Sequence, residues 1–215
     1  MSFLSHLKSQ ASALQNQNQQ QWQGVEECTR LTELACKMVW GYLQELAPQL
    51  NVLTPAAPRL TLDGKTPWPA MRLAGFRIDA RKKMLRNKEV FDYLNIGWQL
   101  VPQQGAVVTD TVTVNFPPDL QRVEGSLHAG NVKYERHEVR HPQKNSLQAY
   151  RFAYQTEARG SVTITPDHDR GGLAFRLVTV QGFGVKECQW PAAKVNGDLM
   201  DELAKLLVQQ PSHFL

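Results

Sequence analysis

The sequence predicts an α+β fold: a mostly antiparallel sheet of about seven or eight strands, with a long N-terminal helix or helix pair and one C-terminal helix packed on it. Three observations predict it. Apolar residues near the N-terminus recur at helical spacing, those in the middle alternate with polar ones, and a leucine-rich helical pattern returns near the C-terminus. A chain of 215 residues with 42% hydrophobic content can bury a core. We expect a helical arm at residues 1–47, a proline-rich connector at 48–70 and a sheet domain at 71–215.

The arm carries a heptad pattern of apolar side chains, which we call the stripe. A stripe repeated every 3.5 residues is what one helix needs to lie along a partner helix, as in a coiled coil, or along its own copy. We therefore expect the arm to bind a helical protein partner, most economically as a homodimer. The alternative is that the stripe packs on the protein's own sheet. The stripe consists of Leu4, Leu7, Ala11, Leu14, Val25, Cys28, Ala35, Val39, Tyr42 and Leu46.

The middle of the stripe is weak. Asn18 and Gln21 occupy stripe positions in a glutamine- and asparagine-rich stretch, residues 15–23, which only Trp22 interrupts before Gly24. One continuous helix of about 45 residues, spanning about 67 Å, fits this pattern. Two helices hinged near Gly24 fit it as well.

After the arm, the sequence predicts a connector and then a series of strands. Five prolines between residues 48 and 70 disfavour helix, and a short strand is expected at 59–62. Alternation of apolar and polar residues with short turns then predicts antiparallel strands, and a slip of that alternation at Gly75 predicts a β-bulge. The alternating residues include Leu94, Ile96, Trp98 and Leu100; Val112 and Val114; Tyr150, Phe152 and Tyr154; Val162 and Ile164; and Phe175 and Leu177.

Two further helices are predicted. A short crossover helix at 119–129 follows from a capping Asp119 and a closing Gly130. A C-terminal helix at 197–209 has a clear apolar face and ends before Pro211. Burying each leucine of that face contributes about 1.5 to 3 kcal/mol, which favours docking on a sheet. These leucines are Leu199, Leu203, Leu206 and Leu207.

Composition and missing motifs narrow the function classes. Three cysteines form no disulfide framework, the first residues lack the pattern of a signal peptide, and no run of about 18 apolar residues occurs. We therefore expect a cytoplasmic protein with no membrane partner. A phosphate loop, a dinucleotide fingerprint, a nucleophile elbow and a C-x-x-C pair are all missing, so the sequence predicts no cofactor and favours a non-enzymatic role.

The sharpest motif is H-E-x-x-H at residues 137–141. In zinc proteases both histidines reach one ion because they lie one helical turn apart. Here Pro142 follows directly and residues 132–140 have the pattern of a polar edge strand, on which positions i and i+4 lie about 13 Å apart. We expect a charged edge strand and no metal. The acidic and histidine cluster at 167–169 is likewise expected to be a hairpin turn rather than a cation site.

A basic cluster lies within twelve residues, with aromatic residues shortly after it. Cations that neutralise phosphates and aromatics that stack on bases fit a nucleic acid or another polyanion. Nearby Asp79, Glu89 and Asp92 dilute the charge, and a solvated connection between two strands explains the cluster as well. Its members are Arg77, Arg81, Lys82, Lys83, Arg86 and Lys88.

Three hypotheses for function follow. The leading one is a non-enzymatic interaction or scaffold protein that assembles through its N-terminal helix, with Leu4, Leu7, Leu14, Val25 and Val39 as partner-binding residues. The second is a small-ligand-binding protein or enzyme with an apolar pocket between the long helix and the sheet. The third is a polyanion binder, nucleic acid included, that uses residues 77–88.

Overall fold

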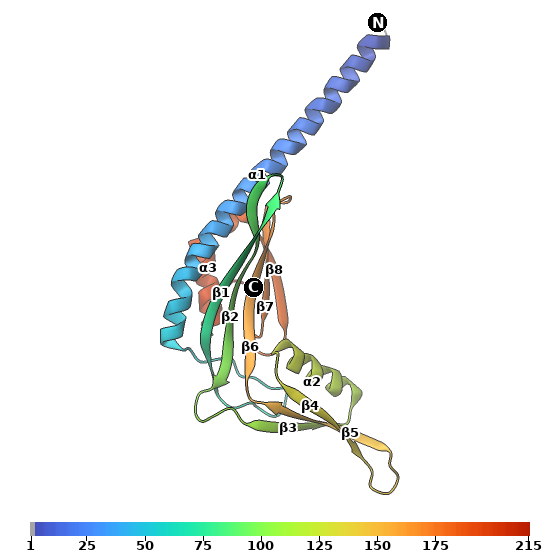
Figure 1. Cartoon of the computed structure of the whole chain (residues 1–215), viewed down its shortest axis with the longest axis vertical. Helices are drawn as coiled ribbons and strands as arrows, with labels where there is room; N and C mark the ends of the chain where they lie inside the picture. The colour runs from blue at the N-terminus through green and yellow to red at the C-terminus, as the bar shows by residue number, and fades with distance from the viewer. Residues whose placement is uncertain (1–2) are drawn as a thin grey trace.

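The computed structural model describes the backbone of residues 3–215 and the side chains of residues 22–215. One long helix, two antiparallel sheets and two shorter helices form the chain (Figure 1), which confirms the predicted α+β class. The elements in order are α1 Phe3–Leu53, β1 Met71–Leu85, β2 Lys88–Pro102, β3 Thr109–Val114, α2 Pro117–Ala129, β4 Tyr134–Arg140, β5 Leu147–Gln155, β6 Ala158–Asp167, β7 Gly172–Val178, β8 Val185–Pro191, the short 3-10 helix η1 Ala192–Lys194, and α3 Gly197–Leu207.

The helix α1 is continuous through Gly24, so of the two alternatives for the arm the single helix is the one formed. Its C-terminal half packs along a sheet, whereas its N-terminal part extends beyond the rest of the chain (Figure 1). We call residues 3–24 the projecting segment. It is about 33 Å long at the helical rise per residue.

The predicted strands form two sheets instead of one. The larger sheet has the order β1-β2-β6-β7-β8 and the smaller one β3-β5-β4, with antiparallel neighbours throughout. The chain crosses from one sheet to the other between Gln155 and Ala158. The predicted bulge is present, because the β1–β2 register shifts between Ala74 and Arg77 and the intervening Gly75 has a φ of +64°, which glycine adopts readily.

Some element boundaries differ from the expected ones. Helix α2 begins at Pro117, ahead of Asp119, because proline has the φ of a first helical residue. Helix α3 ends at Leu207, and Gln209 already has a φ of +60°. The strand expected at residues 59–62 is reduced to one bridge, because Asp63 accepts hydrogen bonds from the amides beyond it and folds the chain into a tight loop.

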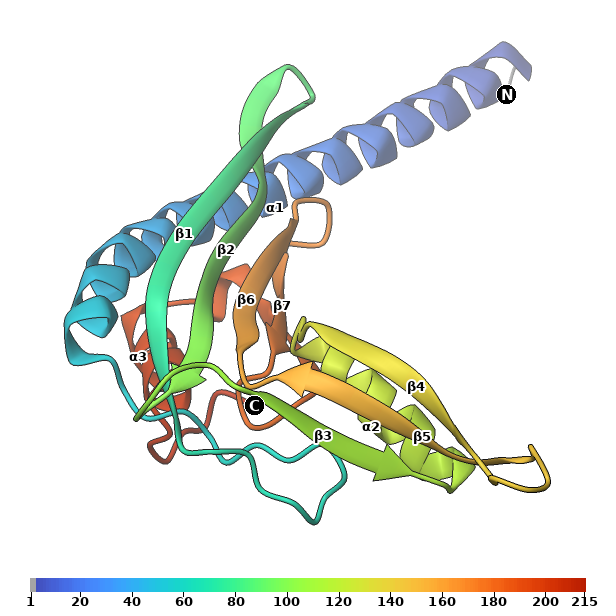
Figure 2. The same ribbon diagram turned by 60° about the horizontal axis from the view of Figure 1, so that its bottom comes forward.

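Helices α1 and α3 cover one face of the larger sheet. The side chains of Cys36, Val39 and Leu43 on α1 are fully buried and pack in one core with those of Leu94 and Ile96 on β2. Figure 2 shows α1 behind this sheet and the smaller sheet with α2 toward its lower end. The opposite face of the larger sheet, which we call the open face, is the one turned toward the viewer there.

Glu33 joins α1 to the edge of this core. Its Oε1 accepts a hydrogen bond from the Phe91 amide at 2.8 Å and lies 3.8 Å from Nε2 of His168. The His168 Nε2 also lies 2.8 Å from the Phe91 carbonyl oxygen, which accepts a hydrogen bond there. The segment 168–171 is the predicted hairpin turn between β6 and β7, and His168, only 4% exposed, fixes that turn against α1.

The substitution Glu33→Ala is expected to lower the free energy of unfolding by about 1 to 3 kcal/mol, because the part-buried Phe91 amide loses its acceptor. Urea denaturation measures this change. The matched control is Glu27→Ala on the same helix, which removes only an exposed pair with Arg30 and should leave stability nearly unchanged. Equal effects of the two substitutions would contradict the role given to Glu33.

The C-terminal tail is held by Glu202 of α3. Its carboxylate accepts hydrogen bonds from Lys205 and from the His213 amide, both at 2.6 Å. The Lys205 ammonium first, and the His213 amide next, lower the pKa of Glu202 from its usual 4.5 to about 2. The tail thereby places Phe214 against Phe175 in the core, where Phe214 is fully buried.

Because folding lowers the pKa of Glu202, its carboxylate stabilises the tail fully above about pH 4.5. This stabilisation is lost as the pH falls toward 2. We therefore expect the protection factor of the His213 amide in hydrogen exchange to fall across this pH window. In Glu202→Ala the same amide should be weakly protected at every pH. Strong protection of that amide in the variant at neutral pH would show that Glu202 does not hold the tail.

Candidate functional site

The projecting segment of α1 is the first candidate site. Leu4, Leu7 and Leu14 lie on it, and their side chains are outside the described residues. Trp22 stands near its end with 63% of its surface exposed. Where the helix reaches the domain, Glu26 lies 3.5 Å from Lys88 of β2, so α1 already contacts the sheet just after Gly24.

The C-terminal half of the stripe faces the chain's own sheet. Ala35 and Val39 are buried in the core, and Tyr42 is half-buried and donates a hydrogen bond to Asp201 of α3 at 2.6 Å. Val25 is half-buried where the helix leaves the sheet. The stripe therefore packs on the sheet in this half, and Val39 has its contacts within the chain.

The basic cluster is divided by the fold. Five of its six members lie toward the end of the β1–β2 hairpin, beside α1, and face four carboxylates. These are exposed pairs, which contribute little stability but weaken the local positive field. The pairs are Arg81 and Lys83 with Asp92, Lys82 with Glu89, Arg86 with Asp169, and Lys88 with Glu26.

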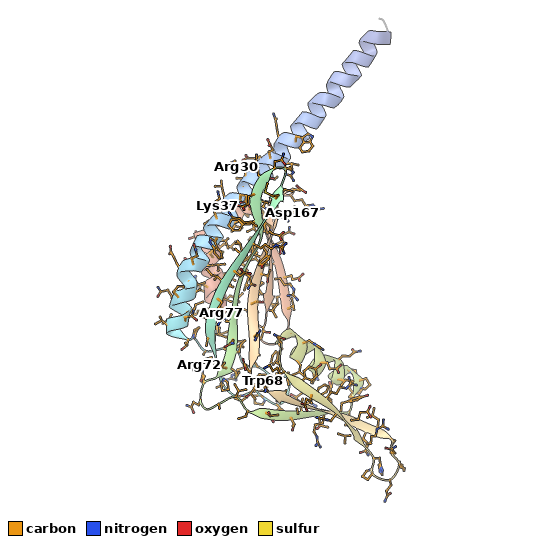
Figure 3. The ribbon with its side chains drawn as sticks, viewed as in Figure 1. Arg30, Lys37, Trp68, Arg72, Arg77 and Asp167 are labelled. Carbon is orange, nitrogen blue, oxygen red and sulfur yellow. The ribbon has the colours of Figure 1, made fainter. Side chains whose placement is uncertain are left out.

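The sixth member, Arg77, lies in the middle of β1 (Figure 3), away from the hairpin end. It belongs to a cavity of about 540 Å³ on the open face, which we call the open-face cavity. Small residues form its floor: Gly97 of β2 pairs with Arg77 on one side and with Ser161 of β6 on the other. A floor of glycine and serine leaves space above the centre of the sheet.

Two more arginines line the open-face cavity, Arg159 of β6 and Arg176 of β7. Within the described part of the chain, Arg77 and Arg159 have no carboxylate within 4.0 Å, and Arg176 has an exposed pair with Glu187 at 3.5 Å. The only carboxylate among the lining residues is Asp79, which accepts a hydrogen bond from the Tyr93 hydroxyl at 2.7 Å. Further lining groups include Asn95, Gln99, His128 and Asn131. The cavity is therefore polar and cationic.

The H-E-x-x-H motif lies on β4, which is an edge strand of the smaller sheet as expected. His137 is paired with Arg151 of β5, and His141 follows the strand, where its Nδ1 accepts a hydrogen bond from the Gln143 amide at 3.2 Å. The helical turn that would bring both imidazoles to one ion is not formed. Across the residues that the structure describes, no three His, Cys, Asp or Glu side chains gather into a metal site.

Zinc should therefore have no effect on stability. We expect equimolar zinc to leave the thermal unfolding midpoint of the wild type and of the His137→Ala/His141→Ala variant unchanged, because His137 lies on a strand and His141 follows it, so the two are not one helical turn apart. Differential scanning calorimetry with and without a chelator measures this. A midpoint that zinc raises in the wild type alone would contradict the prediction.

Two of the three cysteines, Cys36 and Cys188, are poor nucleophiles. Cys36 is fully buried, and burial, with a smaller effect of Glu33, raises the pKa of its thiol to about 12. Burial also raises the pKa of Cys188. Both thiols therefore stay protonated near neutral pH and act as packing residues.

Comparisons with known proteins leave the function to be argued from this geometry. The chain matches no protein-family model, no curated protein and no solved structure. Among the described helices, none combines the length and the apolar character needed to span a membrane. The projecting segment and the open-face cavity are the two features of the fold from which binding can be argued.

Proposed function

We propose that this protein is an interaction protein that assembles through the projecting segment, and that the partner is the same segment of a second copy. The supporting observation is that α1 continues beyond the sheet that it packs on (Figure 1). The stripe covered by the sheet at Ala35 and Val39 runs on through Leu14, Leu7 and Leu4, where no other element of the described chain lies beside the helix.

A partner helix stabilises the projecting segment, because most of the stability of a helix in a protein comes from packing of its apolar face. The leucines of the projecting segment supply such a face, and no other element of the described residues covers it. A partner helix thus stabilises both its own segment and this one.

A second copy suits the charge of the segment. Lys8 is the only Asp, Glu, Lys or Arg among residues 3–24. Two such segments meet without like-charge repulsion, and nothing in them demands a partner of complementary charge. Glutamine and asparagine keep the outer faces of the pair hydrated, and Asn18 and Gln21 also place amide groups on the stripe.

The geometry favours an antiparallel pair. In a parallel pair the partner helix would continue past Cys28 along the stripe, into the space that the chain's own sheet fills from Thr32 onward, where Thr32 and Ala35 are already buried. In an antiparallel pair each helix ends where the other chain's sheet begins. The stripe is then covered along its whole length, first by the partner and then by the sheet.

The variant Leu4→Glu/Leu7→Glu/Leu14→Glu is expected to be monomeric, because three charges per chain would face the partner helix. Light scattering coupled to gel filtration should give twice the chain mass of 24.3 kDa for the wild type at high concentration and the chain mass for the variant. Exposed Trp22 offers a second readout, a blue-shifted emission on assembly. The unfolding midpoint of the domain should not change.

The matched control is Ser5→Glu/Ser9→Glu/Asn16→Glu, which adds the same charge on the outer face of the same helix. It should assemble like the wild type. A monomeric wild type at the highest concentration, or a control that dissociates like the stripe variant, would overturn the proposal.

The relative orientation of the two paired helices is measured separately. Spin labels at Ser5→Cys, with Cys28 and Cys188 replaced by serine, should be about 25 Å apart or more in an antiparallel pair, because they stand near opposite ends of a paired segment. A short distance between the labels would instead show a parallel pair.

A further inference from the structure

We infer that the open-face cavity binds a small organic phosphate of nucleotide size. In this assignment Arg77, Arg159 and Arg176 hold the phosphate groups, and the amides and hydroxyl of the lining bind the polar remainder. The inference concerns the opposite face of the sheet from α1 and does not depend on assembly of the projecting segment.

Strand pairing places the arginines around the floor of the cavity. Arg77 is on one side of Gly97 in a row that continues to Ser161. Arg159 lies two residues from Ser161 in one direction along β6, and Arg176 pairs with Thr163, two residues from Ser161 in the other direction. Standard strand spacing and rise put their Cα atoms about 12 to 16 Å apart. Three long side chains from three strands thus surround one hollow and can turn toward a group bound over it.

The positive charge of the cavity favours an anionic ligand. Three arginines line the cavity, and the one carboxylate among the lining residues, that of Asp79, already accepts a hydrogen bond from Tyr93. Arginine stays charged at all ordinary pH values and donates paired hydrogen bonds that match phosphate oxygens. The exposed pair of Arg176 with Glu187 is weak enough to yield to a phosphate.

Side chains around the cavity favour a small ligand over a nucleic-acid strand. Single-stranded nucleic acids need exposed aromatic rings on which bases stack. Here Trp98 is 3% exposed, and Tyr93 is half-buried and bound to Asp79. A volume of about 540 Å³ lies in the usual range for small-molecule sites. Asn95, Asn131 and Ser161 supply hydrogen-bonding groups for hydroxyls or a heterocycle.

Gly97 permits a variant that fills the floor without changing the charge. A Cβ at this position would meet its nearest atom, Nδ2 of Asn95, at 3.6 Å, which is ordinary contact. Valine also fits the backbone of a strand. Gly97→Val is therefore expected to fold normally and to occupy the space where a ligand would lie.

The experiment is calorimetric titration of the full-length protein, at low salt, with ATP, tripolyphosphate and citrate. We expect ATP to bind, Arg159→Ala and Arg77→Ala each to weaken it by about tenfold, and Gly97→Val to abolish it. The matched control is Arg170→Ala, an exposed arginine in the β6–β7 turn outside the cavity, which should bind ATP like the wild type. The thermal unfolding midpoint confirms that each variant is folded.

The other outcomes separate the assignments. Tripolyphosphate serves as the test of the organic group. If it binds as tightly as ATP and loses affinity equally in the variants, the arginine site is supported, and the proposal that the lining binds the organic part of the ligand is overturned. Citrate binding without phosphate binding would overturn the phosphate assignment. No binding of any probe at millimolar concentration, or equal loss in Arg170→Ala, would overturn the site. The variant Leu4→Glu/Leu7→Glu/Leu14→Glu should bind ATP normally, so failure of assembly and failure of the site are distinguishable.

Discussion

The packing of the α1 stripe on one face of the larger sheet is the interaction on which the rest of the structure depends. Cys36, Val39 and Leu43 lose all contact with solvent there, and burial of apolar surface is the main favourable contribution to folding. Glu33 orients α1 on the sheet, because its carboxylate accepts a hydrogen bond from the Phe91 amide and lies near His168. Because α1 and α3 cover one face only, the larger sheet has a covered side and an open side, and α1 extends beyond the sheet that it covers.

Both proposed surfaces follow from that asymmetry. The projecting segment continues the stripe beyond the sheet at Leu4, Leu7 and Leu14 and is nearly uncharged. The residues that alternate with the core residues along the strands of the larger sheet lie on the open face, and most of them are polar. The open face is hollow where Gly97 pairs with Ser161. An apolar helix face suits a second helix, and a hollow ringed by arginines suits a small anion. The two surfaces lie on different parts of the molecule and can act independently.

The basic cluster shows how far proximity along the chain can mislead about proximity in space. Arg81 to Lys88 follow Arg77 closely in sequence, yet they end at the hairpin tip among carboxylates. Arg77 instead shares a cavity with Arg159 and Arg176, which lie some eighty residues or more further along the chain. The alternation in β6 and β7 places these arginines on the polar phase of their strands, but nothing local to either strand says that β6 pairs with β2. The site could therefore not be assembled from the sequence.

By itself the sequence determined the fold class, a helical N-terminal arm, the C-terminal helix, the bulge at Gly75, the turn after Asp167 and the edge strand that carries most of the H-E-x-x-H motif. These features depend on local periodicity and on the backbone preferences of glycine and proline, which a few neighbouring residues reveal. Only the tertiary structure decided that α1 is unbroken at Gly24, that the strands divide into two sheets, and that half of the stripe is covered while half projects. The division into two sheets and the partial covering of the stripe rest on contacts between residues far apart in the chain, and neither the order of strand pairing nor burial leaves a periodic pattern in the sequence.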